Sequence, residues 1–79
     1  MRTRRLFDEA TAVAKLGRRI RTLVEFSGVP QGTTGTVVAM YEVGREGFSL
    51  DIEWDLPGRS KPLRDGFSKG EYERFLIEE

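Results

Sequence analysis

Apolar residues near the start of the chain recur with the period of a helix. Their spacing is close to i, i+3, i+4 and i+7, which gathers them on one face at 3.6 residues per turn. This stripe consists of Leu6, Phe7, Ala10, Val13, Ala14 and Leu16. It predicts an amphipathic helix over residues 5–16 that ends at Gly17. The apolar face must then be buried against the rest of the domain or against another chain.

The period changes to two from Arg19 onward. Apolar and polar residues alternate over residues 19–26, which predicts a first strand. Residues 36–43 predict a second strand, and the turn residues that follow it lead into a third strand over residues 48–54. That third segment has the cleanest alternation in the chain. Residues 63–67 predict a short fourth strand with a possible bulge at Gly66.

The last twelve residues open with a capping box. The Ser68 hydroxyl can accept a hydrogen bond from the amide of Glu71, whose carboxylate reaches back to the amide of Ser68. We expect one helical turn followed by a short fifth strand in which Phe75 and Ile77 face inward. A helix that continues to the end of the chain is the alternative.

The amino-acid composition limits the kinds of catalytic and metal-binding site that the chain can form. The 79 residues fit one compact domain, in which residues 1–17 form a basic arm with the helix and residues 18–79 form a β-barrel. The chain has no cysteine and no histidine, so it lacks the commonest metal ligands and general base. We therefore expect no catalytic residues, no metal site, no small-molecule cofactor and no enzymatic activity. No apolar segment is long enough to cross a membrane, and we expect a cytoplasmic location.

Charge is balanced overall but unevenly distributed. The net charge is zero, yet residues 1–21 carry seven basic side chains against two acidic ones, and residues 22–58 carry six acids and one base. This asymmetry favours attraction between two halves of the domain. The alternative is nucleic-acid binding, RNA or DNA, through an N-terminal arm and first strand. Its candidate residues are Arg2, Arg4, Arg5, Arg18, Arg19 and Arg21.

The segment GVPQGTTGTVV, residues 28–38, carries three glycines ahead of the second strand. It lacks the lysine and the following helix that nucleotide-binding glycine loops require. We interpret residues 29–32 as a type I turn and Gly35 as a tight entry into the strand.

The glycine spacing also resembles a known motif. Gly28, Gly32, Gly35 and Val37 are similar to the core of the KOW motif of ribosomal and transcription-elongation proteins, although Gln31 stands where that motif usually has a basic residue. The order of elements resembles small SH3-like barrels more widely. The resemblance implies a mainly β fold, namely an antiparallel barrel of about five strands with an N-terminal helix and a short C-terminal helical turn.

We expect this domain to act as a small binding or accessory module. Apolar residues outside the main face of the strands, together with the helical stripe, predict contact with another protein or with a second copy in a homodimer. The candidate partner-binding residues are Leu23, Tyr41, Arg59, Lys61 and Arg64. The last three belong to a loop with two interpretations. One is a binding rim that grips a carboxylate beside Trp54 and Tyr41, and the other, which is the commoner role of such a loop, is a solvated hairpin end.

Overall fold

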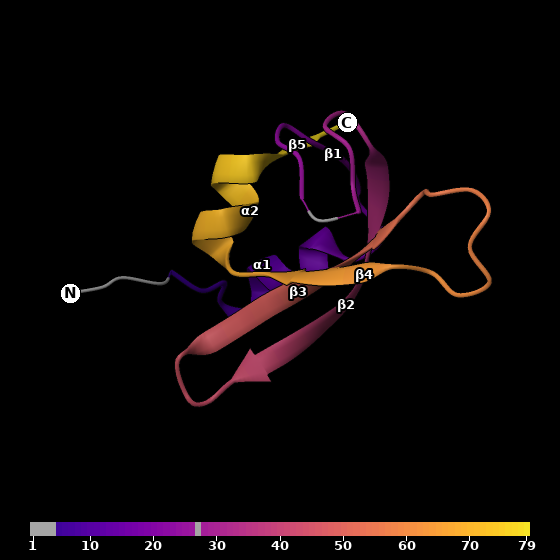
Figure 1. Cartoon of the computed structure of the whole chain (residues 1–79). Coiled ribbons are helices and arrows are strands. Elements are labelled where there is room, and N and C mark those ends of the chain that lie inside the picture. Colours follow the sequence, from indigo (N-terminus) through magenta and orange to yellow (C-terminus); the bar gives the residue numbers. More distant parts are fainter. Residues whose placement is uncertain (1–4, 27) are drawn as a thin grey trace.

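In the part of the chain that the structure describes, the protein has one five-stranded antiparallel sheet and two short helices (Figure 1). The computed structural model describes residues 5–26 and 28–79. The strand order is β4-β3-β2-β1-β5. The elements are α1 (Glu9–Lys15), β1 (Arg19–Thr22), β2 (Thr34–Val43), β3 (Gly47–Trp54), β4 (Arg64–Phe67), α2 (Lys69–Phe75) and β5 (Leu76–Glu78).

The β2–β3 hairpin is the longest pairing in the sheet and confirms the alternation in the sequence. Leu50, Ile52 and Trp54 are buried on one face of β3. The register of the hairpin shifts between Val37 and Ala39, so Val38 is an extra residue on β2. Such a bulge bends a strand and re-aims the bulged side chain. Here Val38 is exposed.

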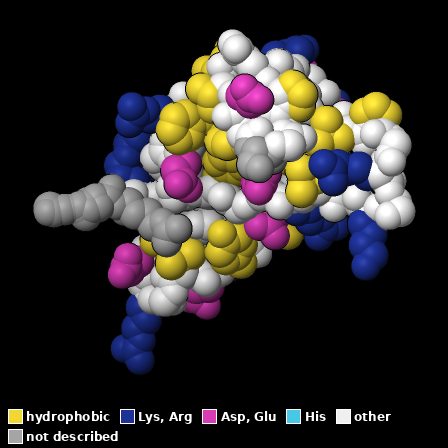
Figure 2. All heavy atoms as spheres, in the orientation of Figure 1, with side chains coloured by type: hydrophobic (Ala, Val, Ile, Leu, Met, Phe, Trp, Pro, Cys, Tyr) yellow, Lys and Arg dark blue, Asp and Glu magenta, His cyan; other side chains and the backbone are white. Residues whose placement is uncertain are grey.

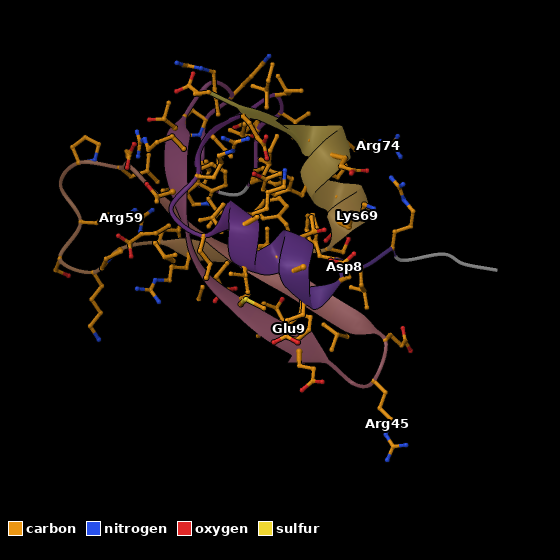
Figure 3. The ribbon with its side chains drawn as sticks, turned by 180° about the vertical axis from the view of Figure 1, so that it is seen from behind. Asp8, Glu9, Arg45, Arg59, Lys69 and Arg74 are labelled. Carbon is orange, nitrogen blue, oxygen red and sulfur yellow. The ribbon has the colours of Figure 1, made fainter. Side chains whose placement is uncertain are left out.

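The core lies between the sheet and the two helices. Figure 3 shows α1 lying across β2 and β3. Phe7 packs edge-on against Tyr72 of α2, with ring centroids 5.6 Å apart, and Phe26 packs against Trp54, Phe67 and Phe75. The buried apolar residues are Phe7, Ala12, Ile20, Val29, Val37, Leu50, Ile52, Trp54, Phe67, Tyr72 and Leu76.

The first helix is shorter than predicted and packs through a different face. It begins after Asp8, whose carboxylate accepts a hydrogen bond from the Thr11 amide at 2.8 Å. Phe7 is excluded from the helix because its backbone pairs with Phe48 of β3. Ala12 is fully buried, whereas four members of the predicted stripe are exposed, namely Ala10, Val13, Ala14 and Leu16. Gly17 ends this segment with φ +85°, as predicted.

The first strand and the glycine turn also differ from their predicted bounds. β1 ends at Thr22, and Phe26 instead forms an isolated bridge with Val29. The turn spans residues 30–33, where the Thr33 amide donates to the Pro30 carbonyl at 3.1 Å. Its third residue, Gly32, has φ +90°, so the turn is one residue later than predicted and has the positive φ of a type II turn.

The C-terminal elements confirm a helix followed by a strand. Both hydrogen bonds of the capping box form between Ser68 and Glu71. The helix is nearly two turns long, and β5 then pairs with β1. Ile77 is exposed, contrary to the prediction, and Leu76 is the buried residue of β5. Phe75 packs against the core as predicted, but from the end of α2.

The sheet is open. Its edge strands, β4 and β5, are joined through α2 and do not pair with each other in the described part of the chain. The predicted barrel is therefore not confirmed. The observed fold is mainly β, with one antiparallel sheet. Within residues 5–26 and 28–79, neither helix has the length and apolar character needed to cross a membrane.

Gly35 offers a direct test of the β2–β3 pairing. A Cβ atom at Gly35 would lie 2.8 Å from the Glu53 carbonyl oxygen and 3.0 Å from Trp54, so the backbone has to move. We expect Gly35→Ala to lower the free energy of unfolding by roughly 1–3 kcal/mol in urea titration. Gly70→Ala is the matched control, because a Cβ there makes only ordinary contacts and alanine favours the helix. Equal stability of the two variants would contradict this packing.

Candidate interaction surface

One carboxylate holds α1 against the domain. Glu78 of β5 forms ion pairs with Lys15 of α1 and with Arg18, whose guanidinium lies 2.9 Å from the carboxylate. The Tyr72 hydroxyl of α2 donates a hydrogen bond to the same carboxylate at 2.9 Å. The Lys15 ammonium also lies 5.5 Å from the centre of the Tyr72 ring. Two helices and an edge strand therefore meet at Glu78.

The environment of Glu78 keeps its carboxyl ionised. Partial burial on its own raises the pKa, but hydrogen bonds from Lys15, Tyr72 and Arg18 outweigh burial and lower the pKa of Glu78 to about 2. Burial, reinforced by the hydrogen bond to this carboxylate, raises the pKa of Tyr72 above its usual range. At neutral pH a charged acceptor thus faces two cations and a neutral phenol.

This anchor decides which face of α1 reaches the solvent. Ala12 is buried and the Lys15 ammonium binds Glu78, so both residues turn toward the core, and Val13 and Ala14 between them face outward. Leu16 follows as the C-cap residue of the helix. Val13 is 52% exposed and Leu16 is 42% exposed. The apolar stripe read from the sequence is present in α1, but most of it points away from the protein's own core.

Val38 extends this exposed apolar area onto the sheet. The Gly17 amide donates to the Val37 carbonyl at 2.8 Å, which places the end of α1 beside the bulge of β2. Val38, the bulged residue, is 38% exposed. We define the α1 surface as Val13, Leu16 and Val38.

The predicted partner-binding residues do not converge. Tyr41 is on the face of the sheet opposite Trp54, since it pairs with Ser49 while Trp54 pairs with Gly35. Trp54 is buried and its indole nitrogen donates to Asp65 at 2.8 Å. The predicted rim beside both aromatic residues is therefore not formed.

The other predicted partner-binding residues lie apart from one another. Arg64 forms an ion pair with Glu53 at 3.0 Å, and Leu23 follows β1, where its amide bonds to Phe75. Arg59 lies in the β3–β4 loop against Gly28, and Lys61 is exposed in the same loop (Figure 3).

A shallow hollow lies beside the β3–β4 loop, but the charged side chains that line it are mostly paired with neighbouring side chains. Its volume is about 540 Å³, and Arg59 lines it together with Glu53 and Asp55. Hydrogen bonds from Arg19 and Thr34 lower the pKa of Asp55. The Glu53 carboxylate forms an ion pair with Arg64. Both carboxylates are therefore engaged by side chains of the same domain.

The arginines proposed for nucleic acid are paired with carboxylates wherever the structure describes them. Arg2 and Arg4 lie outside the described residues. The remaining pairs are Arg5 with Glu73, Arg18 with Glu78, Arg19 with Asp55 and Arg21 with Glu79, at 2.5–2.9 Å. The basic start of the chain is therefore paired with acids later in the sequence, but only Asp55 belongs to the acidic segment of residues 22–58.

Other basic side chains are scattered. In the part of the chain that the structure describes, no ion pair joins Arg45, Arg59, Lys61, Lys69 or Arg74 to an acid. Arg45 lies at the tip of the β2–β3 hairpin, far from Arg59, while Lys69 and Arg74 lie on α2 (Figure 3). On the face shown in Figure 2, the Lys and Arg side chains form separate groups around the rim.

The protein is a small mainly β domain with an exposed apolar helix face. Among residues 5–26 and 28–79, no group of three or more metal-binding side chains comes together. Comparison with models of protein families, with curated proteins and with solved structures finds no match to the chain.

The Glu78 cluster predicts a specific dependence of stability on pH. The pKa of Glu78 is lowered from 4.5 to about 2, so its contribution is complete above pH 4.5 and is lost as the pH falls toward 2. We expect Glu78→Gln to remove roughly 2 kcal/mol of unfolding free energy at pH 7 and to flatten its decline over this range. Urea titrations at several pH values measure both effects.

Glu79→Gln is the control for this experiment. Among the described residues, Glu79 forms an ion pair only with exposed Arg21, and exposed ion pairs contribute about 0–1 kcal/mol. A decline between pH 4.5 and 2 that is as steep in the Glu78→Gln protein as in the unmodified protein would contradict the assignment.

Proposed function

We propose that this protein is a non-catalytic binding module that contacts another polypeptide through the α1 surface. The observation that carries the proposal is the exposure of Val13 and Leu16 at α1 and of Val38 in the bulge of β2, on two segments that the hydrogen bond from Gly17 to Val37 joins. Exposed apolar patches on small domains mark sites of contact with other proteins. The helix that carries Val13 and Leu16 is fixed in place by Glu78, so the surface exists before any partner arrives.

The fold supports the same conclusion. We infer that the sheet is an open form of a small SH3-like barrel with a KOW-like glycine loop. The strand order β4-β3-β2-β1-β5, the helix between β4 and β5 and the bulge in β2 support this inference. Folds of this kind present binding surfaces on a rigid framework and rarely carry a deep catalytic pocket, although the fold alone names no partner.

The charge distribution weighs against nucleic acid as the partner. Phosphate binding needs a continuous basic patch whose charges are available. The described arginines of the N-terminal half each face a carboxylate instead. A salt-dependent mobility shift of labelled RNA or DNA at low ionic strength would reverse this preference.

Photo-crosslinking at position 13 tests the proposed function. A benzophenone amino acid replaces Val13 in one protein and Ile77 in another, because the two side chains are equally exposed and lie on different elements. In cells that express each protein, we expect a discrete polypeptide adduct from position 13 and little from position 77. Mass spectrometry identifies the cross-linked peptide.

A second substitution tests whether the cross-linked adduct depends on the α1 surface. Leu16→Glu in the position-13 protein should reduce the adduct at least fivefold, while the unfolding free energy changes by less than about 0.5 kcal/mol because Leu16 is exposed. Equal adducts from positions 13 and 77, or an adduct unaffected by Leu16→Glu, would contradict the proposal.

A further inference from the structure

We propose that the partner of the α1 surface is a second copy of this chain, with the two α1 helices packed antiparallel across a two-fold axis beside Val13. This inference rests on the proposed function, and it names the occupant of the surface. A two-fold interface uses the same patch on both copies, so the patch must be complementary to itself. The charges at the two ends of α1 meet that requirement.

The start of α1 is acidic. Asp8 caps the helix and Glu9 follows it. Hydrogen bonds from Thr11 lower the pKa of Asp8, and the nearby charge of Lys69 adds to the effect. Lys69 thus offsets one of the two acids. Glu9 is exposed, and no ion pair joins it to a described residue.

The end of α1 is basic. Lys15 and Arg18 share the single carboxylate of Glu78, so two positive charges face one negative charge and a net positive charge remains. The Arg18 side chain is half exposed. In an antiparallel pair, the acidic end of each helix lies beside the basic end of the other, whereas a parallel pair places like charges together.

The shape of the helix suits close approach. Glu9, Val13 and Leu16 are four and three residues apart and therefore lie along one side of α1. The neighbouring Ala10 and Ala14 are exposed and small, so a second helix can approach without displacing large side chains. With the axis beside Val13, Ala10 of one copy lies opposite Leu16 of the other, and Glu9 lies near Arg18.

The size of the α1 surface determines how tightly we expect the two copies to associate. A standard interface buries about 800 Å² per partner. That is about a sixth of the 5043 Å² that this chain exposes, which is more than the α1 surface provides. We therefore expect a weak dimer that dissociates at roughly 10–100 µM.

Sedimentation equilibrium from 5 µM to 1 mM measures the association. We expect the mass to rise from one chain to two across this range, and Val13→Glu to keep the protein monomeric. Thr11→Glu is the matched control, because it adds the same charge to the same helix on its other side, and it should associate normally. Glu9→Lys should weaken association at least fivefold, with a smaller dependence on salt than in the unmodified protein.

The absence of cysteine allows the orientation to be tested by disulfide trapping. Proteins with Ala10→Cys and with Leu16→Cys are mixed under mild oxidation, since a disulfide forms only when Cβ atoms approach to about 4 Å. An antiparallel pair yields the mixed 10–16 disulfide in excess over either symmetric one. A predominance of the symmetric 10–10 product indicates a parallel pair and overturns the proposed arrangement.

The outcomes separate this inference from the proposed function. A protein that remains one chain at 1 mM while position 13 still cross-links to a different polypeptide would reject the second copy and retain the binding role. Cross-links that join position 13 to peptides of the chain itself, together with the loss of dimer in Val13→Glu, support both proposals. A monomer that gives no adduct at position 13 rejects both.

Discussion

The Glu78 carboxylate is the contact on which the arrangement of this domain depends. It lies near the C-terminus, yet it binds Lys15 and Arg18 from the N-terminal segment and Tyr72 from α2. The sheet is open between β4 and β5, so the strands alone do not enclose the core. The two helices cover it, and Glu78 joins both of them to the edge strand. A small chain without disulfides gains cohesion from this junction that its limited core does not supply.

The same junction explains why the sequence predicted α1 correctly as a helix but placed its buried face wrongly. Periodicity identifies a stripe and assumes that the stripe faces the core. Lys15 lies on the other side, and its ammonium is drawn to Glu78, sixty-three residues later in the chain. A pairing over that separation leaves no local signal. Leu6 and Phe7 were included in the helix for the same reason, since the backbone pairing of Phe7 with Phe48 is also a long-range contact.

Local signals were sufficient where the structure depends on local chemistry. The alternation of Phe48, Leu50, Ile52 and Trp54 predicted β3, and the capping box at Ser68 predicted the start of α2. The bulge at Val38 was missed, because its position follows from the pairing register of two strands and not from either strand alone. Val38 belongs to the candidate surface only through that bulge. The sequence therefore predicted Val13 and Leu16 of the α1 surface as apolar positions of a helix, but it gave no signal for Val38.

The unevenly distributed charges of the chain are used mainly in ion pairs within the domain. The arginines of the N-terminal half contact acids from later segments, so most of their charge is compensated within the domain, and only the pair of Lys15 and Arg18 exceeds its single acid, Glu78. This pairing removes the basic surface that the sequence suggested and leaves the apolar face of α1 as the feature that lacks a partner. Because polar contacts hold α1 from its inner side, the apolar residues on its outer side are not required for docking to the core. The helix can therefore present them without loosening the fold, as an interaction surface requires.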